Sequence, residues 1–337
     1  MTAPILNLTE LLPEAFRSDV PDFRRQTFWP SSASIPMKDD TMEGGPSSCL
    51  RAQYYRFKGI KKTDPPSDNA ISNMGNGTAI GEYLVEGIKR LGIYAGDERR
   101  IYVPEFNVSG KVDILCYDDD GNIIPVEVKT VWGHHGRKYT IHPPKGEEKK
   151  PKISHILQLW LYLDFYYRID QGIYSKGFVP MDKNFSFPYG ILYYHARDNG
   201  MRGQHILKIV DTGETFEVKP GIEWPITKIS INGTVNEHMT NEMIYSRWAE
   251  AARYIQNNII PPRDWTIQYS ADHVTKMANN GDLTKTDMSK FEKGRYIEKG
   301  DFQCNYCDFR SKCWNGISKL DLWEGVADKK TEALPYE

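Results

Sequence analysis

The chain has 337 residues, of which 39% are hydrophobic and 26% are charged, and its formal net charge is −2. This composition excludes collagen-like and disordered proteins, and a chain of this length can form one large core. Because the charges nearly balance, a nucleic-acid partner would have to be held by a local basic groove. The sequence has no signal-peptide pattern and no run of about 18 apolar residues, so we expect a cytoplasmic protein that makes no membrane contact.

The chain begins with a region that lacks regular patterning. Residues 1–45 mix prolines, serines and charges, which predicts an irregular N-terminal extension. The folded domain is expected to span residues 46–320, with 321–337 as a C-terminal tail. Near its start, a serine that can cap a helix predicts helix 49–56, and apolar residues at every fourth position predict a second helix over 77–90.

Strands and helices follow in a mixed order. The turn-forming segment 118–122 joins the second and third predicted strands into a hairpin. The segment 264–300 has weak periodicity and is interpreted as an insertion. The expected strands are 100–108, 111–117, 123–131, 189–195 and 204–210, and further helices are expected at 153–168 and 236–257. This order predicts an α/β or α+β fold with a central mixed sheet flanked by helices.

Three polar residues of the predicted hairpin form a candidate catalytic site. Glu127 and Lys129 share one face of their strand, whereas Val126 and Val128 point to the opposite layer. If the hairpin is centred on its turn, Asp113 lies opposite Glu127 with the side chains about 5 Å apart. Paired carboxylates favour Mg²⁺ or Mn²⁺, and Lys129 would orient the attacking water or stabilise charge on a phosphate. The alternative interpretation is an exposed strand of alternating charge.

A buried glutamine supports the catalytic interpretation. Gln158 and Tyr162 are four residues apart and share one face of a helix that is apolar on nearly all sides. A buried glutamine needs hydrogen-bond partners, which an active-site carboxylate, a phosphate or the neighbouring backbone would provide.

Four cysteines form a candidate metal site. Cys304, Cys307 and Cys313 are clustered, and Cys49 lies some 250 residues earlier; together they would link the start of the domain to its end. Four thiolates suit an iron–sulfur cluster or tetrahedral zinc, and the sequence leaves both open. Cys116 has the opposite strand parity from Asp113 and is assigned to the core.

These motifs, in this order, resemble the RecB-type branch of the PD-(D/E)xK nucleases. The resemblance is to the iron–sulfur exonucleases related to the AddB subunit of bacterial helicase–nucleases and to the CRISPR-associated exonuclease. It spans residues 47–314 and is carried by the following motifs: Cys49-Leu50-Arg51, Gly110-x-x-Asp113, Glu127-x-Lys129-Thr130, Gln158-x-x-x-Tyr162, and Cys304, Cys307 and Cys313.

The resemblance implies a role for each motif. It implies Asp113 and Glu127 as Mg²⁺ or Mn²⁺ ligands, Lys129 as the catalytic lysine, and Gln158 with Tyr162 on the substrate side. It also implies a [4Fe–4S] cluster held by the four cysteines, as a staple between the N- and C-terminal segments. The family commonly has a metal-binding histidine where this chain has Gly81, and Glu82 could replace it as a ligand.

The sequence therefore predicts a metal-dependent DNA exonuclease of recombination, repair or processing. Single-stranded DNA ends are the expected substrate, because aromatic and basic residues suit splayed bases. A partner that trims DNA in CRISPR adaptation is a narrower alternative. A metal-stapled DNA-binding protein without catalysis is another, which the glycine at position 81 favours. Protein partners cannot be derived from these motifs.

Overall fold

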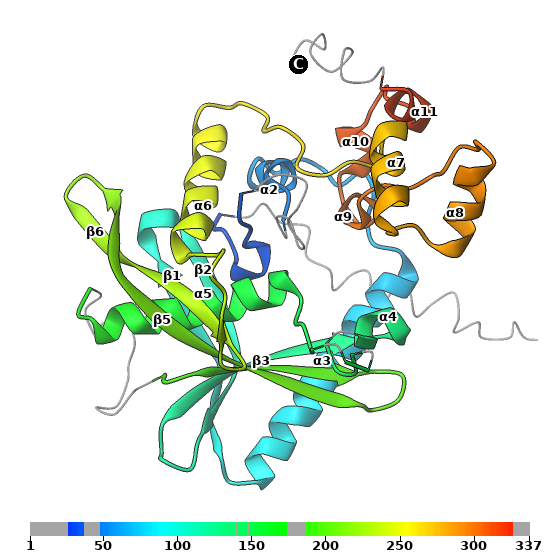
Figure 1. The fold of residues 1–337 in the computed structure, drawn as a ribbon. Coiled ribbons are helices and arrows are strands. Elements are labelled where there is room, and N and C mark those ends of the chain that lie inside the picture. Colours follow the sequence, from blue (N-terminus) through cyan, green and yellow to red (C-terminus); the bar gives the residue numbers. More distant parts are fainter. Residues whose placement is uncertain are drawn as a thin grey trace, which may run out of the picture.

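The structure is a computed structural model that describes residues 26–36, 48–138, 140–143, 145–146, 148–173 and 187–325. Its helices and strands mix along the chain, as Figure 1 shows. The helices are α2 (Leu50–Phe57), α3 (Asp68–Arg90), α4 (Gly133–Lys138), α5 (Ile153–Asp170), α6 (Asn241–Gln256), α7 (Ala271–Asn280), α8 (Lys285–Glu292), α9 (Phe302–Asn305), α10 (Arg310–Cys313) and α11 (Lys319–Trp323), with 3-10 turns η1 (Pro30–Ser32) and η2 (Pro104–Phe106). The strands are β1 (Tyr94–Val103), β2 (Val108–Tyr117), β3 (Ile123–Val131), β4 (Gly190–Ala196), β5 (Arg202–Lys219), β6 (Ile222–Ile231) and β7 (Thr234–Val235).

The described strands form one seven-stranded sheet in the order of the sequence. Only the β3–β4 pair is parallel, and the other neighbours are antiparallel. A parallel pair requires a crossover, and α5 lies within the crossover between β3 and β4. The expected mixed α/β fold, with helices flanking a sheet, is confirmed, and the sheet is mostly antiparallel.

Helix α5 forms the centre of the core. Every residue from Ile156 to Tyr166 is buried, so α5 is enclosed on all sides, as a sequence that is apolar on nearly all sides predicts. On the opposite face of the sheet, Leu84, Val85 and Ile88 of α3 pack against β2 and β3. The two helices therefore cover opposite faces of the strands that carry Asp113 and Glu127.

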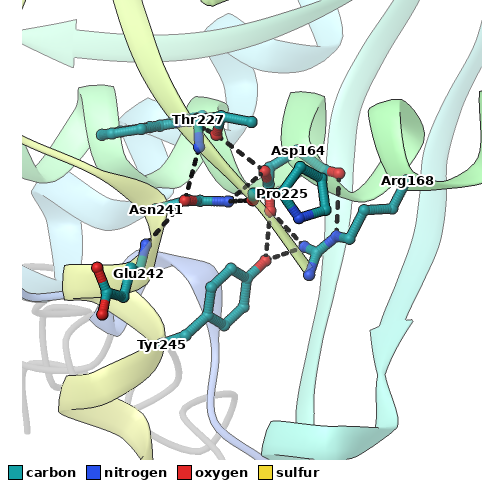
Figure 2. A network of polar contacts seen from close by, with 8 residues as sticks. Asp164, Arg168, Pro225, Thr227, Asn241, Glu242 and Tyr245 are labelled. Atoms are coloured by element: carbon teal, nitrogen blue, oxygen red, sulfur yellow. Dashed lines mark hydrogen bonds and ion pairs between the residues drawn. The ribbon is translucent and has the colours of Figure 1, made fainter. Parts of the chain in front are cut away.

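A buried polar network fixes α5 to β6 and α6 (Figure 2). Asp164 forms an ion pair with Arg168, and both side chains are fully buried. The Asp164 carboxylate also accepts hydrogen bonds from Thr227 Oγ1 at 3.1 Å, Asn241 Nδ2 at 3.0 Å and the Tyr245 hydroxyl at 2.8 Å. Since buried charges are tolerated only when they are paired and hydrogen-bonded, this network specifies how the three elements dock.

The N-terminal segment 26–36 lies in the core, although it falls within the predicted extension. Phe28, Ala33 and Ile35 are buried, and Phe28 forms a parallel bridge with Val108 of β2. The rest of the predicted extension, and residues 326–337 of the predicted tail, lie outside the described residues.

Several elements differ from the sequence prediction. Helix α3 begins at Asp68, nine residues before the expected start, because the Ser67 hydroxyl caps it by accepting a hydrogen bond from the Ala70 backbone N–H. Strand β1 ends at Val103, before Pro104, instead of running to residue 108. Strands β6 and β7 were not expected, and β5 is longer than predicted.

The segment interpreted as an insertion forms α7 and α8. In Figure 1 these helices cluster with α9, α10 and α11 beside α2, away from the β5–β6 hairpin. Within the described residues we find no helix with the length and apolar character that a bilayer crossing requires.

Candidate functional site: an acid–lysine cleft and a cysteine cavity

The two predicted carboxylates come together where β2 and β3 separate. Ile114 pairs with Val126, so the same register places Asp113 opposite Glu127, as the sequence predicts. The ladder ends there, and Asp113 Oδ2 accepts a hydrogen bond of 3.0 Å from the Val128 backbone N–H. The Asp113 side chain thus bridges the opening between the strands and satisfies a backbone donor that has lost its ladder partner.

Glu127 is the most unusual group in the site. Its residue exposure is 0%, and apart from an ion pair of 2.6 Å between Oε1 and Lys129 Nζ, neither carboxylate oxygen has a hydrogen-bond partner. Burial raises the pKa of Glu127 to about 8; the nearby Lys129 ammonium opposes this rise and the Asp113 carboxylate adds to it. A buried carboxylate whose second oxygen, Oε2, has no hydrogen-bond partner is a favourable place for a further cation.

Lys129 is held by a chain of side chains that begins on α5. Its ammonium donates a hydrogen bond of 2.8 Å to Gln158 Oε1, and Gln158 Nε2 donates one of 3.3 Å to the Tyr162 hydroxyl. The Tyr162 hydroxyl in turn donates one of 2.7 Å to the backbone carbonyl of Lys111. Gln158 therefore contacts Lys129 directly, whereas Tyr162 is buried behind it and positions Gln158.

The polar residues at the junction of β2, β3 and α5 line one cleft of about 940 Å³. Asp113, Glu127, Lys129 and Gln158 form part of its wall, and one face of α3 forms the opposite side. Gly81 and Glu82 both belong to that face, so the position of the expected histidine does point at the site. A Cβ at Gly81 would have nothing within 4 Å, which leaves this part of the cleft open.

Sequence reasoning missed Arg197, which lines the same cleft from the turn after β4. Its Nη1 donates to the Asn73 backbone carbonyl at 2.7 Å and to Asn73 Oδ1 at 3.2 Å. Its backbone N–H donates to the Val131 carbonyl, which places Arg197 beside the end of the Glu127 strand. In the sequence, Arg197 is marked only as an arginine in a turn. The parallel pairing of β3 with β4 places that turn beside the cleft.

The described residues around this cleft form no preformed metal site. In the described part of the chain, no three histidine, cysteine, aspartate or glutamate side chains are arranged as a group that could hold a metal ion. Five carboxylate residues line the cleft: Asp97, Asp113 and Glu127 on the strands, and Glu82 and Glu86 on α3. Their hard oxygens fit Mg²⁺ or Mn²⁺, which keep several water ligands.

The four predicted cysteines line a second cavity, of about 190 Å³. All of them are free thiols. Burial raises the pKa of Cys49 to about 11 and that of Cys304 to about 12, and nearby acidic groups add to both shifts. Thiols that share one cavity without forming a disulfide fit a soft metal or a cluster, although no three of them form a closed ligand group here. Cys116 is buried in β2, apart from this cavity.

Polar contacts join the start and end of the domain around the cysteine cavity. The Leu50 backbone N–H donates to Asp264 Oδ2 at 2.7 Å, and Arg263 donates to the Cys313 carbonyl. The backbone N–H groups of Thr63 and Asp64 both donate to the Asp308 carbonyl. The start and the end of the domain therefore lie side by side around the cysteine cavity, and the metal link between them stays a prediction.

Comparisons with known proteins do not identify a family. No family model matches the chain, and no curated protein matches it. One solved structure, described as the crystal structure of SSO0001, is 19% identical, covers 58% of this chain and 76% of its own, and has a TM-score of 0.30. This likeness is too weak to carry an argument about fold or function.

Proposed function

We propose that the protein is a DNA nuclease dependent on Mg²⁺ or Mn²⁺, with a PD-(D/E)xK type of core, that degrades single-stranded DNA from an end. The observation that carries this proposal is the fully buried Glu127 carboxylate, paired with Lys129 and opposite Asp113 at the wall of a large cleft. Burial of an ionisable carboxyl group costs free energy, and such groups with a strongly shifted pKa are found above all at functional sites.

Each residue has a distinct task in this proposal. Asp113 and Glu127 would hold the divalent ion, which supplies a Lewis acid and lowers the pKa of a bound water. Lys129, whose side chain is 21% exposed, presents its ammonium to the cleft, where it stabilises negative charge on the phosphate. Gln158 fixes the ammonium, and Tyr162 fixes Gln158.

The size of the cleft favours one strand over a duplex. A volume of about 940 Å³ between α3 and the sheet is typical of sites for small ligands and has room for a few nucleotides. The four cysteines would hold a [4Fe–4S] cluster that reinforces the junction of the chain ends, and zinc is the alternative occupant. Broad visible absorption of an anaerobic preparation would distinguish the cluster from zinc.

The proposal is tested by cleavage of a labelled single strand in Mn²⁺. Lys129→Ala and Glu127→Gln are expected to lower the rate by at least about a hundredfold, because the first removes the charge that acts on the reacting phosphate and the second weakens a ligand of the divalent ion. Lys219→Ala, at the exposed tip of the β5–β6 hairpin, is the matched control and should cleave like the wild type. Equal activity of Lys129→Ala and the control would refute the proposal.

A DNA-binding protein without turnover is a second candidate. It is favoured by Gly81, which contributes no ligand where the resemblance implies a metal-binding histidine. Binding of the labelled strand without cleavage in Mg²⁺, Mn²⁺ or other divalent ions would support it over the nuclease.

A further inference from the structure

Strands β4 and β5 present a partly open face on the side of the sheet that carries α3. Strand alternation divides their residues between two faces, and on the α5 side Leu192 and its cross-strand partner His205 are fully buried. On the α3 side, the residues of β4 are half-buried and those of β5 are exposed. This β4–β5 face consists of three cross-strand pairs: Ile191 with Ile206, Tyr193 with Gln204, and His195 with Arg202.

The β4–β5 face carries a cation and aromatic rings but no acidic residue. None of its six residues is an aspartate or a glutamate. Asp198, the one acid in the turn that joins the two strands, forms an ion pair with Arg137. The face therefore offers a guanidinium and ring-bearing side chains to a ligand that combines negative charge with flat rings.

Tyr193, His195 and Arg202 lie close enough to act together, with Tyr83 of α3 beside them. Burial raises the pKa of Tyr193, the Arg202 guanidinium opposes this rise, and the Tyr83 hydroxyl adds to it. Burial lowers the pKa of His195, and the same guanidinium lowers it further. Tyr83 is 64% exposed. One guanidinium and three ring-bearing side chains are therefore neighbours at the surface.

Helix α3 lies between this face and the acid–lysine cleft, and the β4–β5 turn connects the two. An added Cβ at Gly77 would lie 3.5 Å from Thr130 Oγ1, so α3 passes closely over β3. His195 is the β4 partner of Thr130, which lines the cleft. Arg197, which also lines the cleft, follows His195 by two residues, or about 7 Å along an extended chain. A single strand that leaves the cleft past Arg197 would therefore reach His195 and Arg202.

An acidic turn limits the face at its other end. Tyr189 directly precedes β4, and its pKa is raised by burial and then by the carboxylates of Asp118, Asp119 and Asp120. Negative charge at that end repels phosphate. An anionic strand is therefore favoured only at the end of the face that carries Arg202.

We infer that the β4–β5 face binds a segment of single-stranded DNA outside the catalytic cleft. Arg202 pairs with a phosphate, and unpaired bases stack on Tyr193 and Tyr83. This inference rests on the proposed function for the choice of DNA, but it concerns binding and not the chemical step. Rings on a sheet can stack only on bases that are not already paired and stacked, so a duplex should bind less tightly than a single strand.

The test is binding of a fluorescein-labelled oligothymidylate to the full chain without divalent metal, followed by fluorescence anisotropy over a range of salt concentrations. Arg202→Ala is expected to weaken binding about fivefold and to reduce the slope of log affinity against log salt by about 0.7. Tyr83→Ala and Tyr193→Leu should each weaken binding at least about fivefold, whereas Tyr83→Phe and Tyr193→Phe should retain most of the affinity.

Two matched controls remove similar side chains elsewhere. Arg295→Ala removes an exposed arginine that follows α8. Tyr117→Ala removes a tyrosine that is 45% exposed at the end of β2, with the strand parity of Leu115 and so on the α5 side of the sheet. Both controls should bind the oligothymidylate like the wild type.

The outcomes separate this inference from the proposed function. If Arg202→Ala and Tyr83→Ala bind like the two controls while the wild type cleaves DNA, the binding face is refuted and the nuclease stands. If both variants lose affinity but the wild type cleaves nothing in Mn²⁺, the binding face stands and the nuclease fails. A wild type that does not bind the oligothymidylate, or that binds a duplex equally well, would overturn the binding face whatever its activity.

Discussion

Replacement of Asp164 by alanine should destabilise the protein more than any surface substitution. The variant leaves the Arg168 guanidinium buried without its carboxylate partner, in the network of Figure 2. Arg168 would keep its contact with the ring of Trp224, at 3.9 Å from the ring centroid. A cation–π contact does not replace an ion pair in a dry interior, because the charge keeps most of its desolvation cost.

The expected loss in the free energy of unfolding is the sum of the contributions of the contacts that the substitution removes. Breaking a buried ion pair from one side costs about 3–5 kcal/mol. The Thr227 hydroxyl, the Asn241 amide and the Tyr245 hydroxyl also lose their acceptor, which adds about 1 kcal/mol each. The total of about 6–8 kcal/mol is comparable with the whole stability of many domains.

The assay is urea denaturation followed by tryptophan fluorescence. Asp164→Ala should lower the urea midpoint strongly. The double variant Asp164→Ala/Arg168→Met should have a free energy of unfolding at least about 2 kcal/mol higher than that of Asp164→Ala, because it no longer buries an unpaired charge. Glu237→Ala, which removes a largely exposed partner of Lys228, is the control and should change the midpoint little. A double variant no more stable than Asp164→Ala would refute this reasoning.

Three further changes test other parts of the structure. Gly110→Ala puts a methyl group 2.6 Å from the Pro30 ring and should lower the free energy of unfolding by about 1–3 kcal/mol, measured by urea denaturation. If the four cysteines hold the proposed cluster, Cys49→Ser should reduce the iron content and speed proteolysis of the α7–α11 region, whereas Cys116→Ala should leave the iron content unchanged. Equal iron content in both variants would exclude Cys49 as a ligand. Arg197→Ala removes the tether of the first turns of α3 and should increase amide hydrogen exchange there; unchanged exchange would show that the tether contributes no stability.

Local patterns predicted the centre of the site because its geometry is local. The turn 118–122 sets the register that brings Asp113 opposite Glu127, and helical spacing alone puts Gln158 and Tyr162 on one face. Strand alternation likewise separated Val126 and Val128 from the acid and lysine.

The remaining features depend on contacts between distant parts of the chain. Parallel pairing of β3 and β4 brings Arg197 to the cleft, and no sequence period encodes that pairing. The bridge from Phe28 to β2 pairs a short segment with little periodicity of its own. The start of α3 was missed because its glycines and asparagines disfavour a helix locally, whereas the Ser67 cap and the packing of its C-terminal half stabilise it.

The most direct test of the central claim compares linear, end-labelled single-stranded DNA with its circular form in Mn²⁺. We expect the wild type to degrade the linear strand and leave the circle intact, and Lys129→Ala to degrade neither. Cleavage of the circle would contradict the need for an end. No cleavage of either DNA with any divalent ion, or equal cleavage by wild type and Lys129→Ala, would contradict the assignment of the acid–lysine cleft as a nuclease site.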